Sequence, residues 1–138
     1  MRMEVVALIG RLMFAALFIK SGIGHFKERE GMTAYARSQG APAPELGVPG
    51  SGVLIFVGGV LVALGLWPDL GALLIAAFLL PVAFYMHAFW KIADPQMRKM
   101  QEVHFWKNIS VAGASLLVFA LFAEYGDDLG LMVSGPLF

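Results

Sequence analysis

Four long apolar stretches constrain the fold of this chain more than any other feature of its sequence. They cover residues 5–26, 51–67, 70–90 and 105–123. Each comes close to the roughly 20 residues that a helix needs to cross a bilayer. A soluble bundle would carry polar residues at every third or fourth position, whereas LIAAFLLPVAFYM (74–86) has almost none. We therefore predict an all-α integral membrane protein, an antiparallel four-helix bundle that forms one domain over residues 1–138.

The connections between these stretches differ in length and content. Residues 28–40 (EREGMTAYARSQG) predict a short interfacial helix that ends at Gly40, and three prolines follow it. The second connection, WPD at 67–69, is so short that the second and third helices must form an antiparallel hairpin. Gly58 and Gly59 in the second helix are expected to allow close packing within the bundle rather than to form a dimer face.

Charged residues outside the apolar stretches predict the orientation of the chain. The chain ends hold only Arg2 among basic residues, together with an acidic patch near residues 124–128. By the positive-inside rule the first and third loops are expected in the cytoplasm and both termini outside. The basic residues of these two loops are Lys27, Arg29, Arg37, Lys91, Arg98 and Lys99.

Composition excludes several classes of function. The chain has no cysteine, which removes disulfides, thiolate metal sites and dithiol redox chemistry. Its formal net charge is zero and no basic block is dense, so nucleic acid is not an expected partner. Arg11 interrupts the first apolar stretch, and we expect this segment to remain in the mature protein rather than to be cleaved as a signal peptide.

A polar stripe runs along the first predicted helix. Glu4, Arg11, Phe18 and His25 are spaced by seven residues, and Ser21 lies on the same side. A charge facing hydrocarbon costs roughly 2.5–3.5 kcal/mol even on the lenient scale, so this face must point into the bundle. Arg11 then needs a partner, which we expect to be a carboxylate, a carbonyl or water.

Three histidines fall towards the same end of the predicted bundle. His25 ends the first helix, His87 lies about one turn before the end of the third, and His104 begins the fourth. In the antiparallel arrangement all three lie towards the cytoplasmic side. We expect His25, His87 and Asn108 to line one cavity, with His104 and Trp90 at its rim.

The neighbours of two histidines allow several interpretations. Trp90 follows His87 by three residues, and Lys107 and Asn108 follow His104 by three and four, which places them on shared helix faces. Such a patch can hold a quinone head group, whose oxygens accept hydrogen bonds, or haem through a histidine pair, or a metal through all three. Alternatively, each side chain anchors its own helix end at the membrane interface. No HExxH or comparable motif supports a metal.

Four segments resemble the DoxX family of small membrane proteins. They are GRLMFAALFIKSGIGHF (10–26), GGVLVALGL (58–66), HAFWKIADPQ (87–96) and HFWKNISVAGASLL (104–117). The resemblance implies a four-helix bundle in the bacterial inner membrane and an association with quinone-linked or oxidative-stress oxidoreductase assemblies. The family-like residues, carried over by position, are Arg11, Ser21, Gly22, His25, Phe26, His87, Phe89, Trp90, Phe105, Lys107, Asn108 and Gly113.

The leading hypothesis is an inner-membrane subunit that binds a quinone or a similar small apolar molecule and supports a membrane-associated oxidoreductase. No cofactor is required by the sequence, and a quinone fits better than haem. The alternative is a structural accessory subunit without a ligand, and neither requires the chain itself to be an enzyme. A small-solute exporter is disfavoured because every span lacks a central carboxylate. The candidate ligand-binding residues are Arg11, Ser21, His25, His87, Trp90, His104, Lys107 and Asn108.

Overall fold

The computed structural model describes residues 2–138, with side chains from Met3 onward. Arg2, counted above at the chain ends, has its side chain outside the described residues. No strand occurs between residues 2 and 138, which confirms the predicted all-α class. The elements are α1 (Arg2–Lys27), α2 (Arg29–Ser38), α3 (Pro44–Leu64), α4 (Pro68–Met86), the 3₁₀ turn η1 (Phe89–Lys91), α5 (Pro95–Tyr125) and the 3₁₀ turn η2 (Gly126–Asp128).

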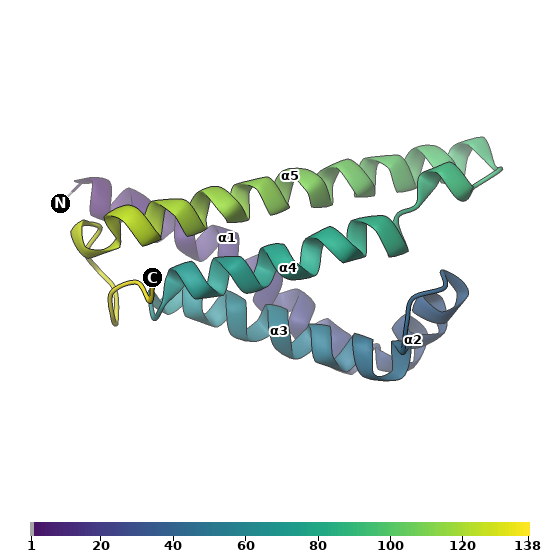
Figure 1. The fold of residues 1–138 in the computed structure, drawn as a ribbon, viewed down its shortest axis with the longest axis horizontal. Helices are drawn as coiled ribbons and strands as arrows, with labels where there is room; N and C mark the ends of the chain where they lie inside the picture. The colour runs from purple at the N-terminus through teal and green to yellow at the C-terminus, as the bar shows by residue number, and fades with distance from the viewer. Residues whose placement is uncertain (1) are drawn as a thin grey trace.

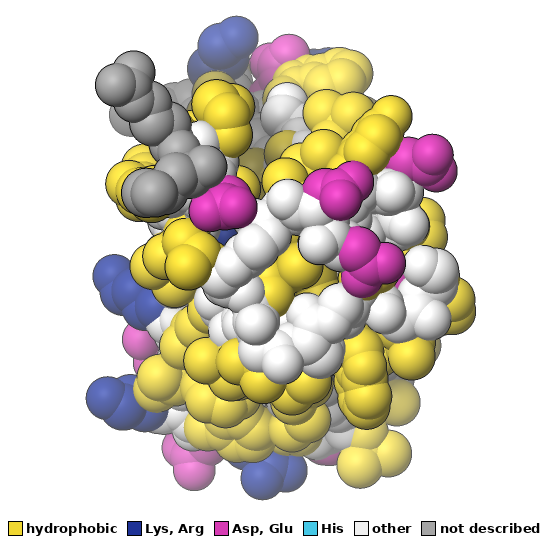
Figure 2. All heavy atoms as spheres, turned by 90° about the vertical axis from the view of Figure 1, so that its left-hand side faces the viewer, with side chains coloured by type: hydrophobic (Ala, Val, Ile, Leu, Met, Phe, Trp, Pro, Cys, Tyr) yellow, Lys and Arg dark blue, Asp and Glu magenta, His cyan; other side chains and the backbone are white. Residues whose placement is uncertain are grey.

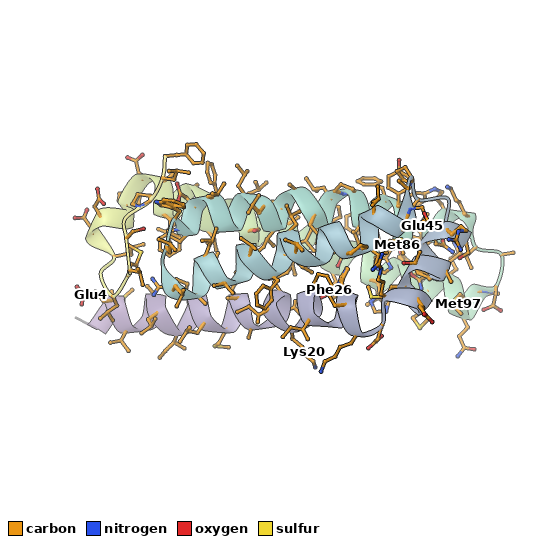
Figure 3. All side chains as sticks on the ribbon, turned by 90° about the horizontal axis from the view of Figure 1, so that it is seen from below. Glu4, Lys20, Phe26, Glu45, Met86 and Met97 are labelled. Carbon is orange, nitrogen blue, oxygen red and sulfur yellow. The ribbon has the colours of Figure 1, made fainter. Side chains whose placement is uncertain are left out.

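Within residues 2–138, four helical segments are long and apolar enough to cross a membrane, as predicted. Their outer faces carry large apolar side chains, and Met13 of α1 and Leu117 of α5 are 73% and 72% exposed. A surface of this kind suits hydrocarbon rather than water. Lys20 extends away from the bundle on the outer side of α1, so its long aliphatic stem can lie along lipid (Figure 3).

The helices pack in the order α1, α3, α4, α5, each along the next. They alternate in direction, so the start of α1 and residue 138 lie at one end of the bundle and α2 lies at the other (Figure 1). Towards the end that carries α2, α1 and α5 diverge (Figure 1).

Glycines let α3 lie close to both of its neighbours. A Cβ atom on Gly58 would come within 2.9 Å of the carbonyl oxygen of Gly71 in α4. One on Gly59 would come within 2.9 Å of the Ile19 side chain in α1. Real Cβ atoms are not found this close to other heavy atoms, so both positions require glycine. The predicted close packing within the bundle is confirmed.

The second spanning helix begins earlier than predicted. α3 begins at Pro44 rather than at residue 51, because proline suits the first position of a helix, where no N–H is needed. Pro49, inside the helix, lacks the N–H that would reach the carbonyl of Glu45. Arg29 Nη2 donates to that carbonyl at 3.5 Å instead, and Arg37 forms an ion pair with the Glu45 carboxylate. These contacts tie α2 to the start of α3.

The last two helices also differ in extent from the predicted spans. α4 ends at Met86 rather than at residue 90, and the chain continues through His87 into the 3₁₀ turn η1. α5 begins at Pro95, ten residues before position 105, because the Asp94 carboxylate caps it by accepting from the N–H of Met97 at 2.8 Å. His104 therefore lies well inside α5.

The short connection between α3 and α4 is covered by the last residues of the chain. The N–H of Val133 donates to the carbonyl of Leu64 at 3.1 Å, and that of Ser134 to Gly65 at 3.0 Å. Gly65 ends α3 with a φ of 65°, a left-handed conformation that glycine adopts without strain. Figure 2 faces this end of the molecule and shows acidic side chains on it.

A buried carboxylate also holds the C-terminal residues. Asp69, in the first turn of α4, is completely buried. Its oxygens accept from the N–H of Leu137 at 2.9 Å and from that of Phe138 at 2.8 Å. Asp69 was not among the predicted functional residues, although an acid is favoured in the first turn of a helix, where the helix dipole stabilises it.

Candidate functional site

The polar stripe of α1 points into the bundle. Arg11, Phe18 and His25 are only 5%, 2% and 6% exposed, which confirms the predicted inward face. Arg11 donates from Nη2 to the carbonyl oxygen of Leu131 at 2.7 Å, so its partner is a carbonyl, one of the three expected kinds. Glu4 lies against the same C-terminal segment, at the end of the bundle that holds the termini (Figure 3).

A cavity of about 680 Å³ lies at the opposite end, lined by residues from all five α-helices. This volume falls in the range of sites that hold organic ligands. Most of its wall is apolar and includes Phe18, Phe78, Leu79, Val82 and Val111. Its polar side chains are Ser21, His25, Glu28, Tyr35, Ser51, His87, Lys107 and Asn108.

Five of the eight candidate residues line this cavity. The structure brings His25, His87 and Asn108 to one space, as their depth and helical spacing predicted. Ser21 and Lys107 lie in the same wall. Ligand binding by these five residues stays a prediction.

The other three candidates lie elsewhere. Arg11 is at the opposite end of the bundle, bonded to residue 131. His104 stacks on His87, with ring centroids 5.3 Å apart and planes inclined by 30°, and is not part of the cavity wall. Trp90 is 46% exposed and packs on Phe84 and Phe105 outside the cavity. Trp90 therefore does not reach the cavity, because α4 ends before it and the turn η1 directs its ring into an aromatic cluster.

His25 is held in one orientation. Its Nδ1 lies 2.8 Å from the carbonyl oxygen of Ser21, one turn earlier in α1. The ring meets Phe78 edge-on, with centroids 5.8 Å apart. The absence of a side chain at Gly52 makes this possible, because a Cβ there would lie 2.6 Å from the Cβ of His25. The imidazole is thus fixed between α1, α3 and α4.

His87 follows α4 directly and is held by α5. Its Nδ1 lies 2.7 Å from Oε1 of Gln101, and its ring stacks on His104 from the same helix. These contacts with α5 replace the helical continuation that the sequence predicted. They place the half-buried His87 ring at the cavity wall.

The helix α2 covers the cavity and contributes a contact that the sequence analysis missed. Tyr35 donates its hydroxyl to the carbonyl oxygen of Met86 at 3.0 Å, which joins α2 to the end of α4. Burial raises the pKa of the Tyr35 phenol above its ordinary value of about 10, so the hydroxyl remains a donor at neutral pH. Met32, Tyr35 and Ala36 all line the cavity, and their spacing of three and four residues was an available signal.

The part of the chain that the structure describes contains no cluster of metal-ligating side chains. No group of three His, Asp or Glu side chains in residues 2–138 is arranged to hold an ion. The cavity wall itself presents hydrogen-bonding side chains beside an apolar surface.

Comparison with known proteins agrees with the residues that suggested a family. Residues 6–88 match the DoxX family model, a range that includes α2, α3, α4 and most of α1. Over 114 residues the chain is 31% identical to inner membrane protein YphA of Escherichia coli (strain K12), which covers 83% of this chain and 81% of that protein. No solved structure matches the chain. With four helices long and apolar enough to cross a bilayer, this chain belongs to the DoxX family and is a multi-pass protein of the bacterial inner membrane.

Proposed function

We propose that this chain is a membrane subunit that binds a quinone, or a similar small molecule with an apolar body, in the cavity of about 680 Å³. In this role it supports a membrane-associated oxidoreductase. The observation that supports the proposal is the composition of the cavity wall. Hydrogen-bonding side chains from α1, α4 and α5 share one space with an aromatic and aliphatic lining.

A quinone matches this wall in two respects. Its oxygen atoms accept hydrogen bonds, and the Lys107 ammonium and the Asn108 amide are donors. Its ring and tail are apolar, as are Phe18, Phe78 and Val111. A site of a few polar groups within an apolar pocket is the usual design for such ligands.

The proposed site lies on the cytoplasmic side of the membrane. The basic residues of the first and third loops belong to the end of the bundle that carries α2, whereas Glu124, Asp127 and Asp128 belong to the end with the termini. The positive-inside rule favours a cytoplasmic position for the basic end and an extracytoplasmic position for both termini. The ligand head group would then meet partners from the cytoplasm.

Ligand binding is tested by titrating the purified full-length chain with a short-chain quinone and following binding by calorimetry. We expect saturable binding that Asn108→Leu weakens by about 1–3 kcal/mol, because a donor to the head group is lost. Glu124→Gln, an exposed change at the far end, is the matched control and should bind normally. If folded protein shows no saturable binding, the accessory role without a ligand replaces this proposal.

The oxidoreductase partner is tested separately by purifying the tagged chain from its native membranes in mild detergent. We expect a redox enzyme that reduces or oxidises a quinone to remain bound in fixed ratio. Recovery of the chain alone, under conditions that preserve other membrane complexes, would remove the partner from the proposal while leaving ligand binding to its own test.

A further inference from the structure

Two imidazoles of the cavity wall already use one ring nitrogen. Nδ1 of His25 lies 2.8 Å from the carbonyl oxygen of Ser21, which has no hydrogen to donate. Nδ1 of His87 lies 2.7 Å from Oε1 of Gln101, which is likewise an acceptor. Both Nδ1 atoms must therefore carry the hydrogen of the bond. In a neutral imidazole the second nitrogen, Nε2, is then left as an acceptor.

The position of the hydrogen bonds determines which ring edge a ligand can meet. In His25, Nδ1 faces the backbone of its own helix. The ring edge that carries Nε2 is therefore the one left for a ligand in the cavity that His25 lines. In His87 the engaged nitrogen faces α5 through Gln101. Each histidine thus offers a fixed acceptor on the edge that its protein partner does not use.

Acceptors of this kind distinguish the two forms of a quinone. The oxidised ring has carbonyl oxygens, which only accept, and it cannot bond to Nε2 of a neutral imidazole. The reduced ring has two hydroxyl groups, each of which donates. We propose that the cavity selects the reduced, hydroxyl-bearing form of its ring ligand, and that His25 and His87 are the residues that determine this specificity. This inference rests on the proposed function and adds to it the form that is bound.

Glu28 in the cavity wall also only accepts, but it is exposed, where water competes for its hydrogen bonds; the remaining polar side chains do not make this distinction. The Lys107 ammonium only donates, and the Asn108 amide both donates and accepts. A hydroxyl oxygen can accept from either of them while it donates its hydrogen to an imidazole. A carbonyl oxygen can use only the donors. The difference in affinity between the quinone and the hydroquinone is therefore determined mainly by the two histidines.

The test compares three probes with the purified full-length chain under anaerobic conditions near pH 8, above the ordinary histidine pKa of about 6.5. The probes are a decyl-substituted benzoquinone, its hydroquinone, and the dimethyl ether of that hydroquinone, which lacks both donors. We expect the hydroquinone to bind on the order of 10-fold more tightly than the quinone, as one or two additional hydrogen bonds allow. The ether should bind no better than the quinone.

Variants assign the preference to the histidines. His25→Phe and His87→Phe should each lower the preference for the hydroquinone several-fold while changing quinone affinity little. His87→Gln, whose amide both donates and accepts, should also lower the preference, by raising quinone affinity rather than by lowering hydroquinone affinity. Val111→Ala, a change in the apolar wall away from both imidazoles, should weaken all three probes alike.

The outcomes separate this inference from the proposed function. Equal affinities, or tighter binding of the quinone, overturn the inference and leave the proposed function in place. If no probe binds to the folded wild-type chain, both are overturned. The wild-type comparison decides the inference even where a variant fails to fold, and the affinity of the ether reports whether the cavity of each variant is intact.

Discussion

Arg11 in α1 and Leu131 near the end of the chain are joined by a hydrogen bond of 2.7 Å, from Nη2 to the carbonyl oxygen, across 120 positions of sequence. The arginine is 5% exposed, and its Nε is buried without a partner among the described residues. Burial of a cation costs free energy, and this hydrogen bond offsets part of that cost. The bond persists only while the segment that contains Leu131 is held in place. The C-terminal residues thus complete the environment of Arg11.

Replacement of Arg11 by leucine should leave membrane insertion intact and loosen the fold. The variant loses the bond that fixes residue 131, and hydrogen bonds to charged groups contribute about 1.5–3 kcal/mol. We expect a lower free energy of unfolding in detergent, measured by circular dichroism during denaturation. Lys20→Leu removes the same charge from the outer face of the same helix and should cause no comparable loss. Equal stability of the Arg11 variant and the wild type would contradict this role.

Replacement of Asp69 by asparagine should release the C-terminal residues. The carboxylate accepts from the N–H of Leu137 and of Phe138 with both oxygens, whereas an amide offers one oxygen and a donor. The amide nitrogen would then face the N–H of Leu137, donor against donor, and the charge that strengthens both bonds is lost, at a cost of about 1–3 kcal/mol. Hydrogen exchange should show faster exchange at residues 133–138, and Glu124→Gln, at an exposed position, is the control. Unchanged protection of this segment would show that other contacts hold it.

Replacement of Gly52 by alanine should destabilise the chain and weaken ligand binding together. The new methyl group would lie 2.6 Å from the Cβ of His25 and 3.3 Å from the Phe26 ring, so α1 and α3 must separate. Overpacking of this kind costs about 1–3 kcal/mol. Gly113→Ala, where nothing lies within 4 Å, should be neutral or stabilising by up to about 1 kcal/mol. Thermal unfolding of both variants measures the difference, and an equal effect would argue against close packing at His25.

The orientation of the chain is testable with reporter fusions. A reporter that is active only outside the cytoplasm should be active at the C-terminus and inactive when inserted after residue 93 in the third loop, because the basic loops favour the cytoplasm. A reporter that fluoresces only in the cytoplasm should give the opposite pattern. Activity of the cytoplasmic reporter at the C-terminus would reverse the topology and move the proposed ligand site to the other side of the membrane.

Sequence alone predicted the membrane helices and the inward stripe of the first one. Long apolar stretches identify spanning helices because the free energy of transfer into lipid is a sum over the side chains of the stretch, whatever the rest of the chain does. The inward orientation of Arg11 and His25 followed from their spacing and the cost of charge in hydrocarbon. The common location of His25, His87 and Asn108 followed from alternating helix directions. Each inference needed only local composition and the geometry of a helix.

Tertiary contacts decided where helices end and which side chains reach the cavity. α4 ends at Met86, and the next residue, His87, bonds to Gln101 in α5, so Trp90 leaves the predicted face. The Tyr35 bond to Met86, 51 residues apart, places α2 over the cavity. A hydrogen bond between distant residues can outweigh the one or two helical bonds lost at a helix end, since each contributes a similar net free energy. Helical periodicity describes one helix at a time, so it cannot locate such bonds, and the tautomer of His87 depends on one of them.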